Sequence, residues 1–186
     1  MRYTIHLFAL RGDEFAARLR DAAAGLLSAT RERIETEGNF EPDDIDLGLR
    51  LAEEICRGQL PNECEMDYFW ALIWLCDTAL ERVPYGQLEG VRSWSYVKAT
   101  GVWPLLSAQT PPFPVPHSRE TPPGVGYVAN SRLTTELLPA LEEPPPASDD
   151  DEEVLEFAEY ARQQLSELAE SIAADGLDLL AVLTVN

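Results

Sequence analysis

The side chains that carry most acid–base and nucleophilic chemistry are scarce in this sequence. It contains two histidines, His6 and His117, and three cysteines, Cys56, Cys64 and Cys76. A three-histidine zinc site is therefore impossible, and a cysteine–histidine nucleophile pair would have to use one of these two histidines. We expect His6 to lie in a strand at a sheet edge and His117 to be a solvated loop residue.

The cysteine spacing argues against metal or disulfide chemistry. No CxxC pair occurs, and the three cysteines are an odd number, so both a zinc ribbon and a disulfide framework are disfavoured. Cys56 and Cys76 fall within apolar helical patterns, where a thiol acts as a small hydrophobic side chain. We expect reduced, structural cysteines, no metal site and no cofactor.

Acidic residues could bind a metal or act as an acid–base pair, but their spacing favours neither. The acidic run 149–153 lacks the glycine and the spaced glutamate that shape an EF-hand loop, and acids at a helix start suit its positive end. Neighbours such as Glu53 and Glu54 face different directions on a helix. Phosphate-binding loops, nucleophile elbows and HExxH motifs do not occur. We therefore expect that the protein is not an enzyme.

A proline-rich loop, residues 110–124, and a tryptophan cluster form the most distinctive part of the chain. Six prolines within 110–128 restrict φ and remove backbone donors, so the loop is stiff. All four tryptophans lie between positions 70 and 103, at helical spacings typical of core residues, although an aromatic cage for a cation is an alternative. A small-ligand or peptide site beside the loop is another alternative, and its candidate residues are Trp94, Trp103, Phe113, His117 and Tyr127.

The net charge of −19, from 33 acids and 14 bases, bounds the possible partners. Such a field repels nucleic acids and anionic membranes, and it favours a basic partner if the protein has a partner; a charge that only keeps an acidic protein in solution is the alternative. The chain has no apolar run of about 18 residues and no signal-peptide cleavage pattern, so we expect a cytoplasmic protein that does not span a membrane. The oligomeric state does not follow from the sequence.

The hydrophobic periodicity predicts a helix-dominated α+β fold in a single domain, residues 1–186. Strands are expected at 2–9, with one buried face, and at 177–185, so that a small sheet includes the N- and C-terminal strands. Tyr127 and Val128 could form a short edge strand. An acidic linker, 142–150, precedes a long C-terminal helix. The predicted helices span 13–37, 42–57, 66–83 and 150–174, with a shorter one from Ser131 that Pro139 limits or ends.

The order of these elements resembles a known family. The likeness rests on LLSAQTPPFPVPHSRETPPGVGYV (105–128), with support from the opening YTIHLFAL and the closing DGLDLLAVLTV. These stretches are similar to an uncharacterised bacterial family, common in actinomycetes, called domain of unknown function 7691. The resemblance implies the same α+β architecture and no known catalytic residues.

We consider four functional hypotheses, of which the first is an acidic protein-binding antagonist. It would be an immunity protein or inhibitor that neutralises a basic toxin or effector. The others are the ligand-binding module described above, an enzyme that uses His117, and a DNA mimic, which the uneven distribution of acids disfavours. The partner-binding residues of the first hypothesis are Asp149, Asp150, Asp151, Glu152, Glu153, Glu156 and Glu159.

Overall fold

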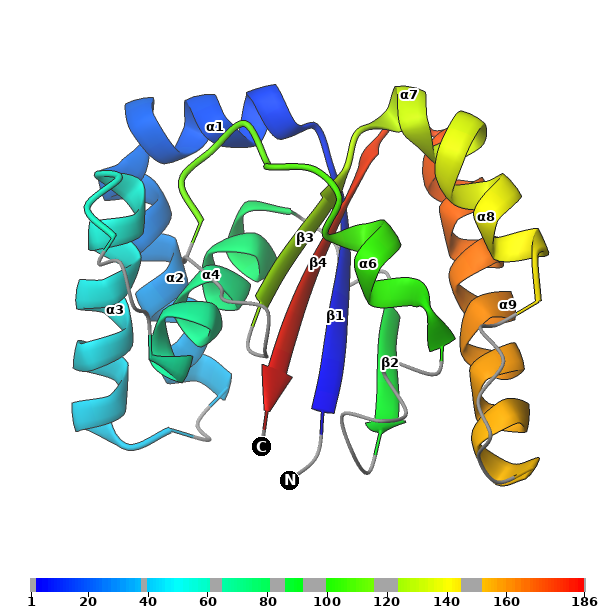
Figure 1. The fold of residues 1–186 in the computed structure, drawn as a ribbon. Coiled ribbons are helices and arrows are strands. Elements are labelled where there is room, and N and C mark those ends of the chain that lie inside the picture. Colours follow the sequence, from blue (N-terminus) through cyan, green and yellow to red (C-terminus); the bar gives the residue numbers. More distant parts are fainter. Residues whose placement is uncertain are drawn as a thin grey trace.

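A four-stranded antiparallel sheet occupies the centre of the protein (Figure 1). The computed structural model describes residues 3–37, 40–60, 65–80, 86–91, 100–115, 124–144 and 152–185, without the side chains of residues 37, 86–91 and 153. The strands are β1 (Tyr3–Leu10), β2 (Gly86–Val91), β3 (Gly124–Val128) and β4 (Asp178–Val185). Their order in the sheet is β2-β1-β4-β3.

The two terminal strands are neighbours along their full length. β1 and β4 pair antiparallel, from Tyr3 opposite Val185 to Leu10 opposite Asp178. This confirms the prediction that both ends of the chain contribute to one sheet. The short edge strand predicted around Tyr127 is also present, as β3. β2 was not predicted, because the glycines of GQLEGV give that segment little intrinsic strand propensity.

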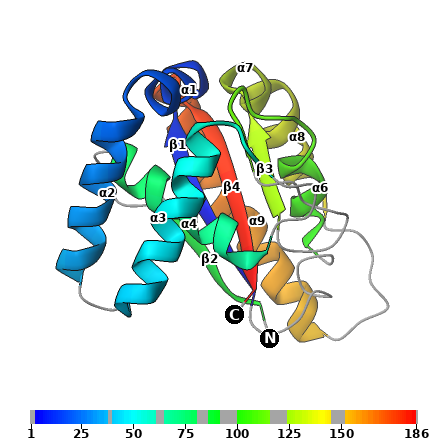
Figure 2. The same ribbon diagram turned by 90° about the vertical axis from the view of Figure 1, so that its left-hand side faces the viewer.

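Helices cover both faces of this sheet (Figures 1 and 2). One layer contains α1 (Gly12–Asp21), α2 (Ala23–Glu37), α3 (Pro42–Cys56) and α4 (Met66–Ala79). The opposite layer contains α6 (Val102–Leu106), α7 (Asn130–Arg132), the π-helical turn η1 (Leu133–Leu137), α8 (Leu138–Glu142) and α9 (Glu152–Ala174). The helix-dominated α+β fold predicted from the sequence is therefore confirmed.

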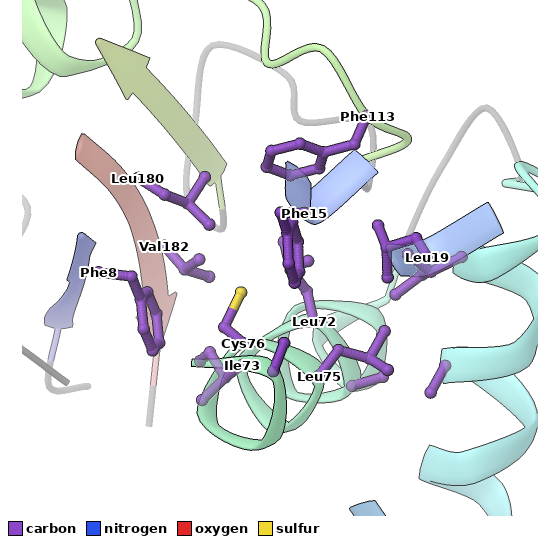
Figure 3. Packing of buried hydrophobic residues seen from close by; sticks show 14 of the residues in the cluster. Phe8, Phe15, Leu19, Leu72, Ile73, Leu75, Cys76, Phe113, Leu180 and Val182 are labelled. Carbon is purple, nitrogen blue, oxygen red and sulfur yellow. The ribbon is translucent and has the colours of Figure 1, made fainter. Parts of the chain in front are cut away.

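The central strands bury both of their faces. Ile5 and Leu7 of β1 belong to the hydrophobic cluster under α9, whereas Phe8 and Leu10 belong to the cluster beside α1 and α4. Figure 3 shows Phe8 in that second cluster. The prediction of a single buried face was wrong, because alternate residues of a strand between two helical layers meet apolar neighbours on both sides.

His6 does not lie at a sheet edge, which corrects its predicted position. Its strand has β2 on one side and β4 on the other, and its side chain is only 4% exposed. Its Nε2 lies 3.2 Å from Oγ1 of Thr184, and its ring meets that of Trp70 edge to face at 5.4 Å. Burial disfavours the charged imidazolium and lowers the pKa of His6 to about 4.

The predicted helix over 13–37 is divided into α1 and α2. The break lies at Ala22, whose φ of −122° and ψ of 20° are not helical. Phe15 and Leu19 of α1 pack into the core beside the sheet, whereas α2 packs against α3 and α4. A single straight helix could not follow both surfaces, so tertiary packing overrides the continuous helical pattern.

The segment after β3 remains helical through Pro139, although the sequence predicted that this residue would limit or end the helix. The π-helical turn η1 precedes the proline, which occupies the first turn of α8. The first turn of a helix needs no backbone donor. The new turn therefore accepts the proline without losing a hydrogen bond.

Acidification is expected to destabilise the protein through His6. The pKa of this residue is about 4 in the folded state and 6.5 in its ordinary environment, so unfolding takes up a proton. The free energy of unfolding should fall by up to about 3 kcal/mol as the pH decreases from about 6.5 to 4, and it should not change from this cause above that range.

The His6→Gln variant provides the comparison, because glutamine retains hydrogen-bonding capacity but does not titrate. Urea denaturation at a series of pH values gives the free energy of unfolding of both proteins. The effects of carboxylate titration are common to both, so they cancel when one free energy is subtracted from the other. Parallel pH profiles for the two proteins would contradict the assignment.

Candidate functional site

The outer surface of α9 carries an acidic face. The inward side of this helix buries Val154, Ala158, Ala161, Leu165, Ala169 and Ile172. The outward side exposes Glu152, Glu156, Glu159, Glu167 and Glu170, which we call the α9 acidic face. Because a helical residue adds 1.5 Å, the 23 residues of α9 extend for about 34 Å.

The five glutamates of the α9 acidic face form no ion pair with a described arginine. Some exposed acids of the opposite layer are paired, for example Glu35 with Arg31 at 3.4 Å and Glu53 with Arg57 at 2.6 Å. Like charges four residues apart on a helix repel each other, so the face opposes helix stability.

The single arginine of α9, Arg162, cannot neutralise this face. Its side chain is buried, with 6% exposure. The guanidinium donates hydrogen bonds to backbone carbonyls of Thr100 at 2.8 Å, of Glu143 at 2.7 Å and of Ala140. Arg162 thus joins α9 to the end of α8. Its positive charge does not pair with the glutamates of the α9 acidic face.

An exposed aromatic residue, Tyr160, lies within the acidic surface. It follows Glu159 directly and lies one helical turn after Glu156, and 59% of it is exposed. Tyr160 was not among the site residues predicted from the sequence. Its position could have marked it as a site residue, because it lies outside the apolar row that contains Phe157 and Ala161. An aromatic residue on the polar side of an amphipathic helix is unusual.

Only part of the predicted acidic site can be placed. Glu152, Glu156 and Glu159 are exposed on one side of α9, at spacings of four and three residues. Residues 149–151 lie outside the described part of the chain, as does the side chain of Glu153. Their participation in partner binding stays a prediction.

The residues of the alternative ligand site are dispersed or buried. Phe113 is 5% exposed and Tyr127 is 7% exposed. The ring of Phe113 packs edge to face on Phe15 at 4.8 Å (Figure 3). Trp103 is partly buried on α6, whereas Trp94 and His117 lie outside the described residues. The rings of Phe113 and Tyr127 are part of the core, so a ligand could reach them only if the loop moved.

The tryptophans that the structure describes border the core instead of filling it. Trp70 and Trp74 of α4 and Trp103 of α6 are all partly buried. The helical spacing of Trp70 and Trp74 predicted burial. The Trp74 ring lies against Gly48 of α3, whereas the Trp70 ring meets His6 of β1, and part of each indole stays accessible.

The carboxylate of Asp178 connects four elements beside the proline loop. Its Oδ2 accepts hydrogen bonds from the Tyr127 hydroxyl at 2.7 Å and from the backbone N–H of Gly12 at 2.8 Å. Its Oδ1 accepts from the backbone N–H of Asn130 at 2.8 Å. The anion therefore lies at the N-terminal ends of both α1 and α7, where helix dipoles stabilise it. Burial and this carboxylate raise the pKa of Tyr127.

The described cysteines are poorly suited to act as nucleophiles, and Cys64 lies outside the described residues. Cys56 and Cys76 are free and buried. Burial raises the pKa of the Cys56 thiol to about 11 and that of Cys76 well above its ordinary value, so neither residue readily forms a nucleophilic thiolate. Across the described residues, no three His, Cys, Asp or Glu side chains group as metal ligands.

These features define an α+β protein with helices on both sides of an antiparallel sheet and a strongly acidic helix on its surface. The chain belongs to the family described as Domain of unknown function (DUF7691), whose model matches residues 1–183. The resemblance noted in the sequence is thus confirmed. No curated protein and no solved structure gives a significant match. In the described residues, no helix is both long enough and apolar enough to cross a membrane.

Removal of the Asp178 carboxylate is expected to destabilise the fold strongly. The Asp178→Ala variant loses three hydrogen bonds to a charged acceptor and leaves partly buried donors without a partner. We expect the free energy of unfolding to fall by about 4 kcal/mol, as measured by urea denaturation. Glu170→Ala, which removes an exposed acid, should change it by about 0.5 kcal/mol or less. Similar losses in the two variants would contradict the central role of Asp178.

Proposed function

We propose that this protein is a cytoplasmic, non-enzymatic binding protein that uses the α9 acidic face to bind a basic protein, such as a toxin or effector that it neutralises. The observation that carries the proposal is the row of five exposed glutamates along one side of α9, without an ion-pairing arginine among the described residues. A row of like charges that costs helix stability is better explained by a partner than by folding.

Electrostatics would act mainly on the rate of encounter. The net charge of −19 attracts a basic protein over a distance of about a Debye length, roughly 8–10 Å at physiological ionic strength. The α9 acidic face concentrates this field on a straight helix whose inward side is fixed by its apolar contacts and by Arg162. Binding should therefore weaken steeply as salt is added.

Tyr160 would supply the apolar anchor of the same interface. Exposed charges at the rim of an interface contribute little net affinity, whereas a tyrosine that becomes buried at its centre is a frequent hot spot. Tyr160 lies among the glutamates with 59% exposure, so a partner that covers the acidic face also buries this ring.

Site-specific photo-crosslinking tests whether α9 contacts a basic protein. A photoreactive phenylalanine derivative replaces Tyr160 in the source cells, and the adduct is identified by mass spectrometry. We expect one predominant adduct with a protein of high isoelectric point. The same group placed at Glu32, an exposed position on α2, should not form this adduct. Equal yields at both positions would contradict the proposal.

Charge-neutralised variants then test the contribution of the acidic face with the purified partner. The triple variant Glu152→Gln, Glu156→Gln, Glu159→Gln should slow association at least tenfold at low salt, as measured by surface plasmon resonance. The matched control replaces three exposed acids of the opposite layer, Glu32, Glu41 and Glu65, with glutamine. Because both variants change the net charge equally, an equal effect would exclude a local role of α9.

A further inference from the structure

A cavity of about 350 Å³ lies between α3 and α4, in the helical layer opposite α9 (Figures 1 and 2). Its volume falls within the range of small-ligand sites. Two tryptophans, a phenylalanine and two aspartates dominate the lining, which comprises Phe40, Asp44, Leu47, Gly48, Asp67, Trp70 and Trp74. The cavity belongs to neither the proline loop nor the α9 acidic face.

The aromatic walls are held in place by contacts behind them. A Cβ at Gly48 would lie only 1.9 Å from Cζ3 of Trp74. The Trp74 indole can therefore pack against α3 only because residue 48 has no side chain. Phe40 meets the Trp74 ring edge to face at 5.1 Å, and His6 meets the Trp70 ring at 5.4 Å. The two indoles are therefore oriented before any ligand binds.

Two carboxylates border these rings without a partner of their own. Asp44 of α3 and Asp67 of α4 are exposed, and no described residue forms a hydrogen bond or ion pair with either side chain. Both lie in the first turn of a helix, where an acid is favoured in any case. Asp43, in the first turn of α3, and Glu65, the N-cap residue of α4, are acids at the same two helix ends that do not line the cavity. The helix dipole thus explains why acids occur at these helix ends. It does not explain why Asp44 and Asp67 both line the aromatic cavity.

We propose that this cavity binds a small organic cation of the alkylguanidinium class. A planar guanidinium can stack on an indole and donate hydrogen bonds to a carboxylate at the same time. A quaternary ammonium has no N–H to donate to Asp44 or Asp67, and a primary ammonium is more strongly hydrated. The alkyl chain would contact Leu47, and the proposal does not depend on the function assigned to α9.

Titration with butylguanidinium, followed by NMR of the tryptophan indole N–H resonances, tests the proposal. Of the four tryptophans, Trp70 and Trp74 should give the largest shifts, with assignments from single Trp→Phe variants. Saturable shifts at these two residues are expected, and their absence would overturn the proposal. Butylurea, which has nearly the same shape but no charge, should bind at least tenfold more weakly, since the charge-assisted contacts are lost.

A matched pair of variants separates the cavity from the general negative field. Asp44→Asn with Asp67→Asn should weaken butylguanidinium binding about tenfold or more. Asp43→Asn with Glu65→Gln removes the same total charge beside the same helix ends, and it should change affinity less than twofold. Equal weakening in both variants would show nonspecific attraction and overturn the assigned site.

The same titration distinguishes a small molecule from a protein side chain as the natural source of the cation. Butylguanidinium should bind at least as tightly as the blocked peptide Gly-Arg-Gly, because the cavity lies between two helices and is sized for a small ligand. Tighter binding of the peptide would assign the site to an arginine of a partner protein and would overturn the small-molecule assignment.

Discussion

The fold depends on one carboxylate, that of Asp178 at the start of β4. It accepts hydrogen bonds from the first turns of α1 and α7 and from Tyr127 of β3, so it fixes where the chain leaves the sheet on both sides. Gly12 is required at this point, because a Cβ there would lie 2.4 Å from the Tyr127 oxygen. The described start of the proline loop, residues 110–115, reaches the same region: Phe113 packs on Phe15, and Pro112 lies beside Gly12.

Burial of the sheet on both faces separates the two surfaces that we assign to binding. β1 and β4 contribute alternate residues to two hydrophobic clusters, one under α1–α4 and one under α6–α9. The cavity between α3 and α4 and the α9 acidic face therefore belong to different layers, with the central strands between them (Figure 1). A ligand in the cavity and a protein on α9 could bind without direct contact.

The distribution of the few basic residues determines where negative charge is left unpaired. The chain has 14 bases for 33 acids. Arg31 and Arg57 pair with acids on the surface of α2 and α3, whereas Arg162 is buried against backbone carbonyls. As a result, the glutamates of the α9 acidic face and the aspartates of the α3–α4 cavity have no ion-pair partner within the described residues. Both sites favour cations because their carboxylates are unpaired. The α9 acidic face would bind a protein, whereas the cavity would bind a small molecule.

Local sequence patterns determined the types of most elements, including both terminal strands, the edge strand β3 and the acidic character of α9. These features follow from periodicity, breakers and composition, which act within one segment. Tertiary structure alone decided the division of the first helix at Ala22, the central position of His6, the formation of β2 and the cavity around Trp74. Each of these depends on a neighbour distant in sequence: Gly48 can admit an indole only when α4 lies across α3, and β2 forms because β1 offers a free edge. The pattern of one segment cannot predict contacts with residues that are distant in sequence.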